Sequence, residues 1–387
     1  MTWQIASIGD HVEKVSTWNP TQSLTSGTFR YIDLSSVDKD QKVISIENIL
    51  EINGIDAPSR AKQIVQVDDV LVSTVRPNLN GVAIVPNELD GATASTGYCV
   101  LRPNEKSLYS RYLYHWVKTN SFVSDMVKKA TGANYPAVSD KIIKESEIPL
   151  PPLPEQKRIA AILDKADSLR RKNQQAIQLA DKFLRAVFLD MFGDLSSSSG
   201  NKVKLGDVVV LDAPMVDPRE DKYLDMLHFG PDRIKKETGL LLPALTAREE
   251  NLISKKFLFD NRYVLYSKIR PYLKKCAMAE TTALCSADMY PIRPVDGLVT
   301  KEFLWRLLLS DIFTRYTETL PGRANIPKLN RDELSAFEFS LPYFSEQKKF
   351  SKLVKKLLTT SNLVNESSCN SGQIFNILSQ KSFSGKL

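Results

Sequence analysis

The chain has 387 residues, of which 42% are hydrophobic and 25% are charged, and these fractions are those of a globular protein rather than a disordered one. Lys and Arg outnumber Asp and Glu by 52 to 45, a balance that suits a polyanionic partner without identifying one. The four cysteines form no CxxC pair and no apolar run is long enough for a membrane span, which argues against a structural zinc site and against a membrane protein. The expected location is a reducing cytoplasm.

The first 150 residues begin with strands and end with helices. Short apolar runs typical of β-strands, such as residues 69–75 and 98–102, are separated by turn signals as far as residue 105. Helical periodicity follows between residues 108 and 130, then a Gly-containing loop at 131–136 and a proline-rich extended run at 148–152. This order predicts a mixed α/β (α+β) domain.

A long helix is predicted from Pro154 to Phe192. Pro154 suits a first helical turn, and Gly193 is a common helix stop. At about 1.5 Å per residue the segment is roughly 55–60 Å long, more than a compact domain can cover, so it requires a partner helix. Apolar residues at 3-4 spacing predict the contact seam, which comprises Ile159, Ile162, Ala166, Leu169 and Ala176.

The second half of the sequence repeats the first. Glu155-Gln156-Lys157 matches Glu346-Gln347-Lys348 at an offset of 346 − 155 = 191, and the same offset holds without a gap from Ser95 to Phe192. The repeat supplies the partner helix, with a seam at Phe350, Leu353, Leu357, Ile374 and Leu378. We therefore expect two pseudo-symmetric domains, at residues 1–147 and 196–338, separated by an antiparallel pair of long helices at 148–195 and 339–387.

Catalytic motifs are absent from the sequence. It contains no GxxxxGK[ST], GxGxxG after a strand, HExxH or GxSxG, and no Asn/Asp-Pro-Pro-Tyr/Phe tetrapeptide of the adenine methyltransferase type. Carboxylates are plentiful, but none forms a pair that stands out from a solvated surface. This absence favours a binding protein and leaves a divergent methyltransferase or nuclease as an alternative.

Basic loops with amide and aromatic side chains occupy equivalent places in the two halves. Such loops suit phosphate contacts and base-edge hydrogen bonds, although a solvated turn explains any single residue as well, and a turn role is the simpler one for the asparagines of the helix-following loops. The candidates after the central strands are Arg76, Asn78 and Asn80 in the first half and Arg262, Lys268, Arg270, Tyr272, Lys274 and Lys275 in the second. The candidates in and after the helix-following loops are Asn134, Tyr135, Lys141, Arg323, Asn325 and Lys328.

These features together resemble the specificity subunits of Type I restriction–modification systems. The resemblance rests on the run IPLPPLPEQKRIAAILDKAD at 148–167, its weaker copy at 339–358, the Gly-containing loops at 131–136 and 321–327, and the terminal FSGKL. It implies two target recognition domains, each of which reads one half of a bipartite asymmetric sequence in double-stranded DNA, with the helix pair as a ruler for the spacer. The second copy departs from the pattern at Phe344-Ser345 and in its polar helix centre, residues 362–371.

The resemblance also implies that the chemistry belongs to partners. Two methyltransferase subunits would dock on the helices and use S-adenosylmethionine, and restriction–translocase subunits would use ATP and Mg²⁺, while this chain would bind no cofactor or metal. Two other readings stay open: a coiled-coil adaptor whose globular ends hold proteins, and a self-sufficient DNA methyltransferase or nuclease with a divergent site. Salt-dependent DNA binding separates the first from a DNA-recognition subunit, and methyl transfer by the chain alone would establish the second.

Overall fold

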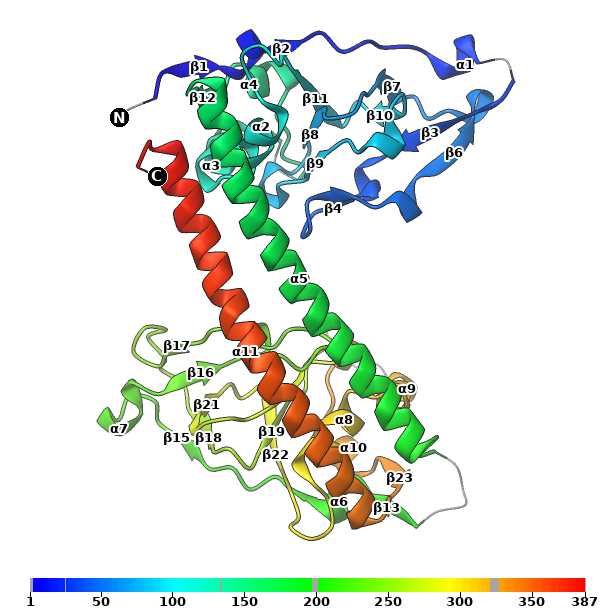
Figure 1. The fold of residues 1–387 in the computed structure, drawn as a ribbon. Helices are drawn as coiled ribbons and strands as arrows, with labels where there is room; N and C mark the ends of the chain where they lie inside the picture. The colour runs from blue at the N-terminus through cyan, green and yellow to red at the C-terminus, as the bar shows by residue number, and fades with distance from the viewer. Residues whose placement is uncertain (1–2, 25, 133, 197–200, 321–326, 387) are drawn as a thin grey trace. The chain divides into compact units, whose positions relative to one another are not determined.

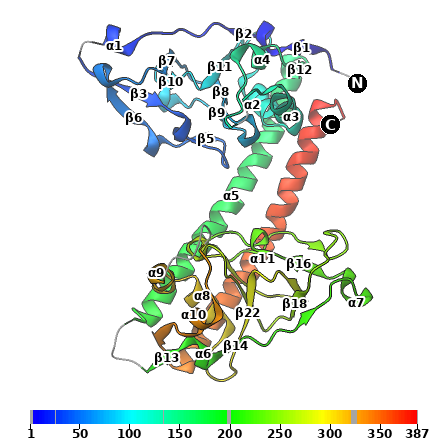
Figure 2. The same ribbon diagram turned by 180° about the vertical axis from the view of Figure 1, so that it is seen from behind.

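The computed structural model describes residues 3–24, 26–132, 134–196, 201–320 and 327–386, and it describes no side chains at 360–374 and 376. The chain forms two compact units. Unit 1 comprises Met1–Asn173 and Ser367–Leu387, and unit 2 comprises Gln174–Glu366. Each unit contains one copy of the repeat together with the beginning of one long helix and the end of the other (Figures 1 and 2).

Unit 1 is built from two four-stranded sheets and a set of short helices. The central sheet has the order β2-β11-β8-β9, and the outer sheet has the order β6-β3-β10-β7, in which only β3 and β10 pair in parallel. Two smaller antiparallel pairs, β1 with β12 and β4 with β5, complete it. The elements are β1 (Ile5–Ser7), β2 (Val12–Glu13), α1 (Pro20–Ser23), β3 (Thr28–Ile32), β4 (Val37–Asp38), β5 (Val43–Ile44), β6 (Leu50–Asn53), β7 (Ala61–Ile64), β8 (Val70–Ser73), β9 (Val82–Ile84), β10 (Thr93–Ser95), β11 (Tyr98–Pro103), α2 (Ser110–Val117), α3 (Asn120–Lys129), α4 (Asp140–Lys144) and β12 (Glu147–Pro149).

The central sheet of unit 1 is covered on both faces. In β8, Val70 and Val72 pack with helices α2 and α3, whereas Leu71 packs with the outer sheet. The neighbouring strand β11 alternates in the same way, with Cys99 on the helix side and Val100 on the other. Because successive side chains of a strand point to opposite faces, a strand buried on both faces needs the continuous apolar runs that the sequence shows.

Unit 2 repeats this arrangement with one more strand in its outer sheet. The central sheet has the order β14-β22-β19-β20 and the outer sheet the order β15-β18-β21-β16-β17, and β19 alternates between helix-side Val264 and sheet-side Leu265. The mixed α/β prediction is therefore confirmed for both units. The elements are β13 (Lys202–Lys204), α6 (Leu205–Val208), β14 (Val209–Val210), β15 (Met215–Val216), α7 (Asp221–Leu224), β16 (Leu227–Phe229), β17 (Leu245–Thr246), β18 (Lys256–Phe259), β19 (Val264–Ser267), β20 (Cys276–Met278), β21 (Ala283–Cys285), β22 (Met289–Pro294), α8 (Lys301–Leu308), α9 (Asp311–Thr319), α10 (Arg331–Ser335) and β23 (Glu338–Ser340).

The two long helices are α5 (Leu153–Phe192) and α11 (Phe344–Phe383), each of 40 residues. At about 1.5 Å per residue each is roughly 60 Å long. In unit 1 the first turns of α5 share a core with Phe383 at the end of α11, and in unit 2 Phe350 near the start of α11 packs on Phe188 near the end of α5. Within each unit, therefore, the two helices run antiparallel (Figure 1). Among the described residues, no helix has the length and apolar character that a membrane span requires.

The buried face of the long helices differs from the predicted seam. Leu169 and Leu353 are 51% and 41% exposed, and Ala176 is exposed too, so these three predictions are wrong. Ile159 and Phe350 are fully buried as predicted, Ile162, Ala166, Leu357 and Leu378 are half-buried, and the side chain of Ile374 lies outside the described residues. Fully buried positions outside the predicted seam include Gln156, Ala160, Leu163 and Asp167, with Gln347 and Val354 at the offset of 191. The face is displaced because the short helices of each unit, in addition to the other long helix, cover it.

Candidate nucleic-acid interface

Each unit carries the same turn after an equivalent strand of its central sheet, β8 in unit 1 and β19 in unit 2. In unit 1 a short 3-10 helix, Pro77–Leu79, is flanked by Arg76 and Asn80 at φ of 50° and 46°. In unit 2 Pro271–Leu273 is flanked by Arg270 and Lys274 at φ of 49° and 47°. A left-handed conformation in a residue other than glycine costs roughly 1–2 kcal/mol. Its occurrence at both ends of both turns makes them the candidate functional element of each unit.

Backbone hydrogen bonds join each turn to the loop that follows the helices. Arg76 N–H donates to the Pro136 carbonyl at 2.7 Å, and Arg270 N–H donates to the Pro327 carbonyl at 2.8 Å. The Ser73 hydroxyl, and that of Ser267 in the other unit, donates to the carbonyl two residues on. Two segments that the sequence presented separately thus form one surface in each unit.

In unit 1 the turn and the adjoining loop present four predicted residues to solvent. The Arg76 guanidinium lies 4.8 Å from the centre of the Tyr135 ring, and Tyr135 is 69% exposed. Asn78 of the turn and Asn134 of the loop are exposed as well. A cation stacked on an aromatic ring with amides nearby offers donors for phosphate oxygens and for base edges. Lys141 is exposed on α4, 3.6 Å from Glu145.

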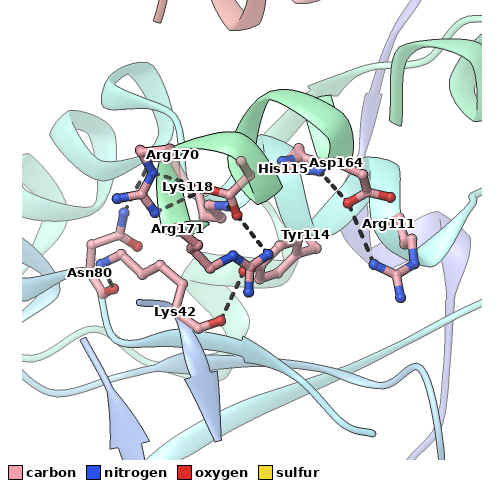
Figure 3. A network of polar contacts seen from close by, with 10 residues as sticks. Lys42, Asn80, Arg111, Tyr114, His115, Lys118, Asp164, Arg170 and Arg171 are labelled. Atoms are coloured by element: carbon pink, nitrogen blue, oxygen red, sulfur yellow. Dashed lines mark hydrogen bonds and ion pairs between the residues drawn. The ribbon is translucent and has the colours of Figure 1, made fainter. Parts of the chain in front are cut away.

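Asn80 has an internal role in unit 1. Its Nδ2 donates to the Lys118 carbonyl at 3.3 Å, and its own carbonyl accepts from the Lys42 ammonium. The Tyr114 hydroxyl in turn donates to the Lys42 carbonyl at 2.8 Å. The amide predicted to face DNA therefore braces the turn against α2 (Figure 3).

The turn of unit 2 presents Arg270, which is exposed, and Tyr272, which is 50% exposed. The lysines of this region have partners within the chain, although the Lys328 side chain is still 55% exposed. Lys268 lies over the Tyr290 ring at 5.6 Å, Lys274 pairs with Asp311, Lys275 donates to the Pro231 carbonyl at 2.6 Å, and Lys328 lies 3.5 Å from Asp288. Arg323 and Asn325 lie outside the described residues.

Arg262 does not belong to this surface. It precedes β19, whereas Arg270 follows it, and eight residues of extended chain span up to about 25 Å. Its guanidinium binds Asp260, with Nη2 to Oδ2 at 2.7 Å. The structure therefore places Arg262 and the turn residues on either side of β19, and a DNA contact of Arg262 stays a prediction.

Two buried glutamines, which the sequence shows only as part of the Glu-Gln-Lys repeat, fasten the long helices to their units. Gln156 Oε1 accepts from Tyr109 N–H at 2.8 Å, and Nε2 donates to the Ser107 and Pro151 carbonyls, each at 2.9 Å. Gln347 makes the same three bonds, to Thr300 N–H at 3.0 Å and to the carbonyls of Leu298 and Pro342 at 3.1 and 2.9 Å. The repeat therefore preserves the direction in which each helix leaves its unit.

An ionic cluster where α5 meets the turn of unit 1 was not foreseen from the sequence (Figure 3). The Asp167 carboxylate, 1% exposed, lies 3.1 Å from Lys118, 2.9 Å from Arg170 and 3.0 Å from Arg171. Burial lowers the pKa of Lys118 to about 8, even though Asp167 opposes the shift. Burial alone would raise the pKa of Asp167, but the three cations lower it.

A second part of this cluster surrounds Asp164, which accepts from His115 at 2.9 Å and lies 3.4 Å from Arg111. The His115 side chain is fully buried, and burial lowers its pKa despite the hydrogen bond to Asp164. The cluster therefore ties α2 to α5 through groups that the sequence places about fifty residues apart.

The model of the Type I restriction modification DNA specificity domain matches residues 2–179 and 235–368. The specificity subunit of the Type I restriction enzyme EcoDI from Escherichia coli is 26% identical over 318 residues, which cover 72% of this chain and 70% of that protein. The specificity subunit of the enzyme MjaVIII from Methanocaldococcus jannaschii is 23% identical over 380 residues, covering 92% and 86%.

Solved structures show the same fold. The S subunit of a Type I restriction–modification system from M. genitalium has a TM-score of 0.59 at 14% identity, and the match covers 99% of this chain and 96% of that one. A chain of a type I R-M system solved in connection with complex assembly and conformational transition has a TM-score of 0.51 at 22% identity, covering 100% and 98%.

Proposed function

Since this chain belongs to the family of Type I restriction modification DNA specificity domains, we propose that it selects the DNA sequence on which a Type I restriction–modification complex acts. Each unit reads one half of a bipartite target through its turn and the adjoining loop. The observation that carries this proposal is the duplicated left-handed turn, because it places an exposed arginine at the same position of both units.

The two half-sites differ in this proposal, so the target is asymmetric. The turn of unit 1 reads Arg-Pro-Asn-Leu-Asn and that of unit 2 reads Arg-Pro-Tyr-Leu-Lys. An exposed amide at Asn78 can pair with a base edge, whereas the equivalent Tyr272 offers a ring and a hydroxyl. The shared arginine supplies a phosphate contact that does not depend on sequence.

The long helices connect the two readers in one chain. When one unit occupies its half-site, the covalent link raises the effective concentration of the other unit at the second half-site. A helix holds its length better than a loop does, so the spacer between the half-sites has a fixed number of base pairs.

Catalysis belongs to the partners in this proposal. Two methyltransferase subunits bind to the long helices and use S-adenosylmethionine, and restriction–translocase subunits use ATP and Mg²⁺. The chain itself makes no covalent change and binds no cofactor, and it acts in the cytoplasm where the chromosome lies. Its family membership and the absence of the common catalytic motifs support this division.

An arginine comparison in the assembled complex tests the proposal. Arg270→Ala is expected to weaken binding to the methylated motif by roughly tenfold and to lower the salt dependence, because one phosphate contact is lost. Arg262→Ala is the matched control, since Arg262 lies in the same basic stretch but at the other end of β19. Equal effects of the two substitutions would contradict the assignment of the turn, and salt-independent binding would favour an adaptor that holds proteins.

A further inference from the structure

The part of the ionic cluster around Asp167 carries more positive charge than this carboxylate can balance. Lys118, Arg170 and Arg171 all bind Asp167, and Arg170 is close enough to Lys42 to help lower its pKa, after the larger effect of burial. Asp38 and Asp40 act in the opposite direction, but only on the Lys42 side. The Asp167 end of the cluster thus has three cations on one carboxylate.

Two of these cations are partly exposed and retain unused donors. Arg170 uses Nε and Nη2 on one oxygen of Asp167, and Arg171 uses Nη2 on the other. Their side chains are 26% and 31% exposed, whereas that of Lys118 is 7% exposed. Within the described part of the chain, Nη1 of Arg170 and Nε and Nη1 of Arg171 have no hydrogen-bond partner, so an anion from outside can accept from both.

The position of the cluster indicates which anion would bind to these arginines. Asn80, which closes the turn begun by Arg76, donates to the Lys118 carbonyl and accepts from Lys42. Arg170 is near enough to Lys42 to affect its pKa, and Figure 3 shows both arginines on the side of the cluster that holds Lys42 and Asn80, while Arg111 and His115 lie around Asp164. The free arginine donors therefore lie beside the turn that contacts DNA in the proposed function.

The cluster is present in one half only. At the offset of 191 the second half has Leu309 for Lys118, Leu358 for Asp167, and Ser361 and Asn362 for the two arginines. Leu309 is 4% exposed, so an apolar side chain fills in unit 2 the position that a buried cation holds in unit 1. The cluster ties α2 to α5, but the second half folds with apolar side chains in its place, which makes the cluster a candidate for a further role.

We propose that Arg170 and Arg171 bind backbone phosphates of the duplex directly beside the half-site read by unit 1, and that Asp167 and Lys118 are positioning residues that hold both guanidiniums in place. This inference rests on the proposed function. A guanidinium fixed by a carboxylate loses less freedom when it binds a phosphate, and the N–H groups that it does not use on Asp167 can donate to phosphate oxygens. Because only unit 1 has the cluster, the contact is expected beside one half-site only. A phosphate contact adds affinity without reading sequence.

The test measures DNA binding by the full chain in its complex, on a duplex that carries the methylated motif. The double substitution Arg170→Gln with Arg171→Gln is expected to lower the slope of log affinity against log salt by up to about 2 and the affinity at 0.1 M salt by roughly tenfold or more. Arg158→Gln is the matched control, an exposed α5 arginine held by Glu155. Arg170→Lys with Arg171→Lys keeps both charges and is expected to keep most of the slope.

Phosphate ethylation locates the contact. In the wild type, ethylation of phosphates beside one half-site should interfere with binding, and this interference should vanish in the double Gln variant while the motif stays the same. An unchanged slope and interference pattern would overturn the inference, and if the variant then also bound less methyltransferase subunit, the arginines would be assigned to a protein contact. Wild-type complex that binds no motif duplex would overturn the proposed function as well, which separates the two failures.

Discussion

Gln156 offers a direct way to test how the long helices are fastened. Replacing Gln156 by Ala removes one acceptor and two donors, and it leaves Tyr109 N–H and the carbonyls of Ser107 and Pro151 without their partner. An unsatisfied buried group costs about 1–3 kcal/mol, and water can reach the half-buried ones, so we expect a loss of roughly 3 kcal/mol in the free energy of unfolding. Gln347→Ala should cost less, roughly 2 kcal/mol, because one of its acceptors belongs to Leu298, which is 44% exposed.

Urea unfolding and hydrogen–deuterium exchange measure the two effects separately. Gln156→Ala should speed amide exchange at residues 107–117 and in the first turns of α5, and leave residues 298–308 unchanged, whereas Gln347→Ala should do the reverse. Gln175→Ala, an exposed glutamine on the same helix, is the control. If Gln156→Ala and Gln175→Ala shift the unfolding midpoint equally, the fastening role is wrong.

Other predictions concern the buried charges and the helix length. Asp181→Ala should destabilise unit 2 by roughly 3 kcal/mol, because the Arg306 side chain is 3% exposed and lies 2.9 Å from this carboxylate. In urea titrations the double variant Asp181→Ala with Arg306→Met should regain most of the lost stability, and no recovery would contradict the ion-pair explanation. Lys118→Leu should stabilise the chain most below pH 8. Its advantage over the wild type should shrink by roughly 2 kcal/mol between pH 8 and 9.5, because Lys118 loses its proton at about pH 8 in the folded wild type and near pH 10.5 in the unfolded one. An advantage that is the same at both pH values would show that burial does not lower the pKa of Lys118. Deleting or duplicating a few residues at 173–180 of α5 should change the spacer of the methylated motif and keep both half-sites, and an unchanged spacer would refute the ruler.

The architecture was predictable because the sequence patterns that specify it, the internal repeat and the long helical segments, extend over many residues. The offset of 191 places Gln156 with Gln347 and Leu163 with Val354, and all four are buried in the structure. The proline-rich run and the stretch without Gly or Pro define α5 to within one residue of its start. The resemblance drawn from the same run is confirmed by the family match.

The buried face of the helices was not predictable from 3-4 spacing alone. Leu169 and Leu353 fit a two-helix seam, yet they are about half exposed. The short helices of each unit also pack on α5 and α11, and this packing buries a different face of each long helix. Asp167 would count as a surface residue by type, and its burial depends on Lys118 from a helix about fifty residues away. Periodicity reports that a helix has a covered face but not which element covers it.

The candidate site was predicted in outline. The turn residues Arg76 and Arg270 are exposed, and Tyr135 joins the first of them because the chain returns through a backbone hydrogen bond that no local pattern reveals. Asn80 and Lys274 turned inward because each closes its turn and meets a helix. Which of these side chains contact DNA stays a prediction.

A chimaera tests most directly whether the two units read separate half-sites. Residues 1–145 are replaced by those of a related specificity subunit, the chain is expressed with its methyltransferase partner, and the methylated motif is determined by sequencing the host genome. The proposed function predicts a bipartite motif in which one half-site is exchanged and the other half-site and the spacer are kept. A motif with both halves altered, or one that is the same as with the unaltered chain, would contradict it.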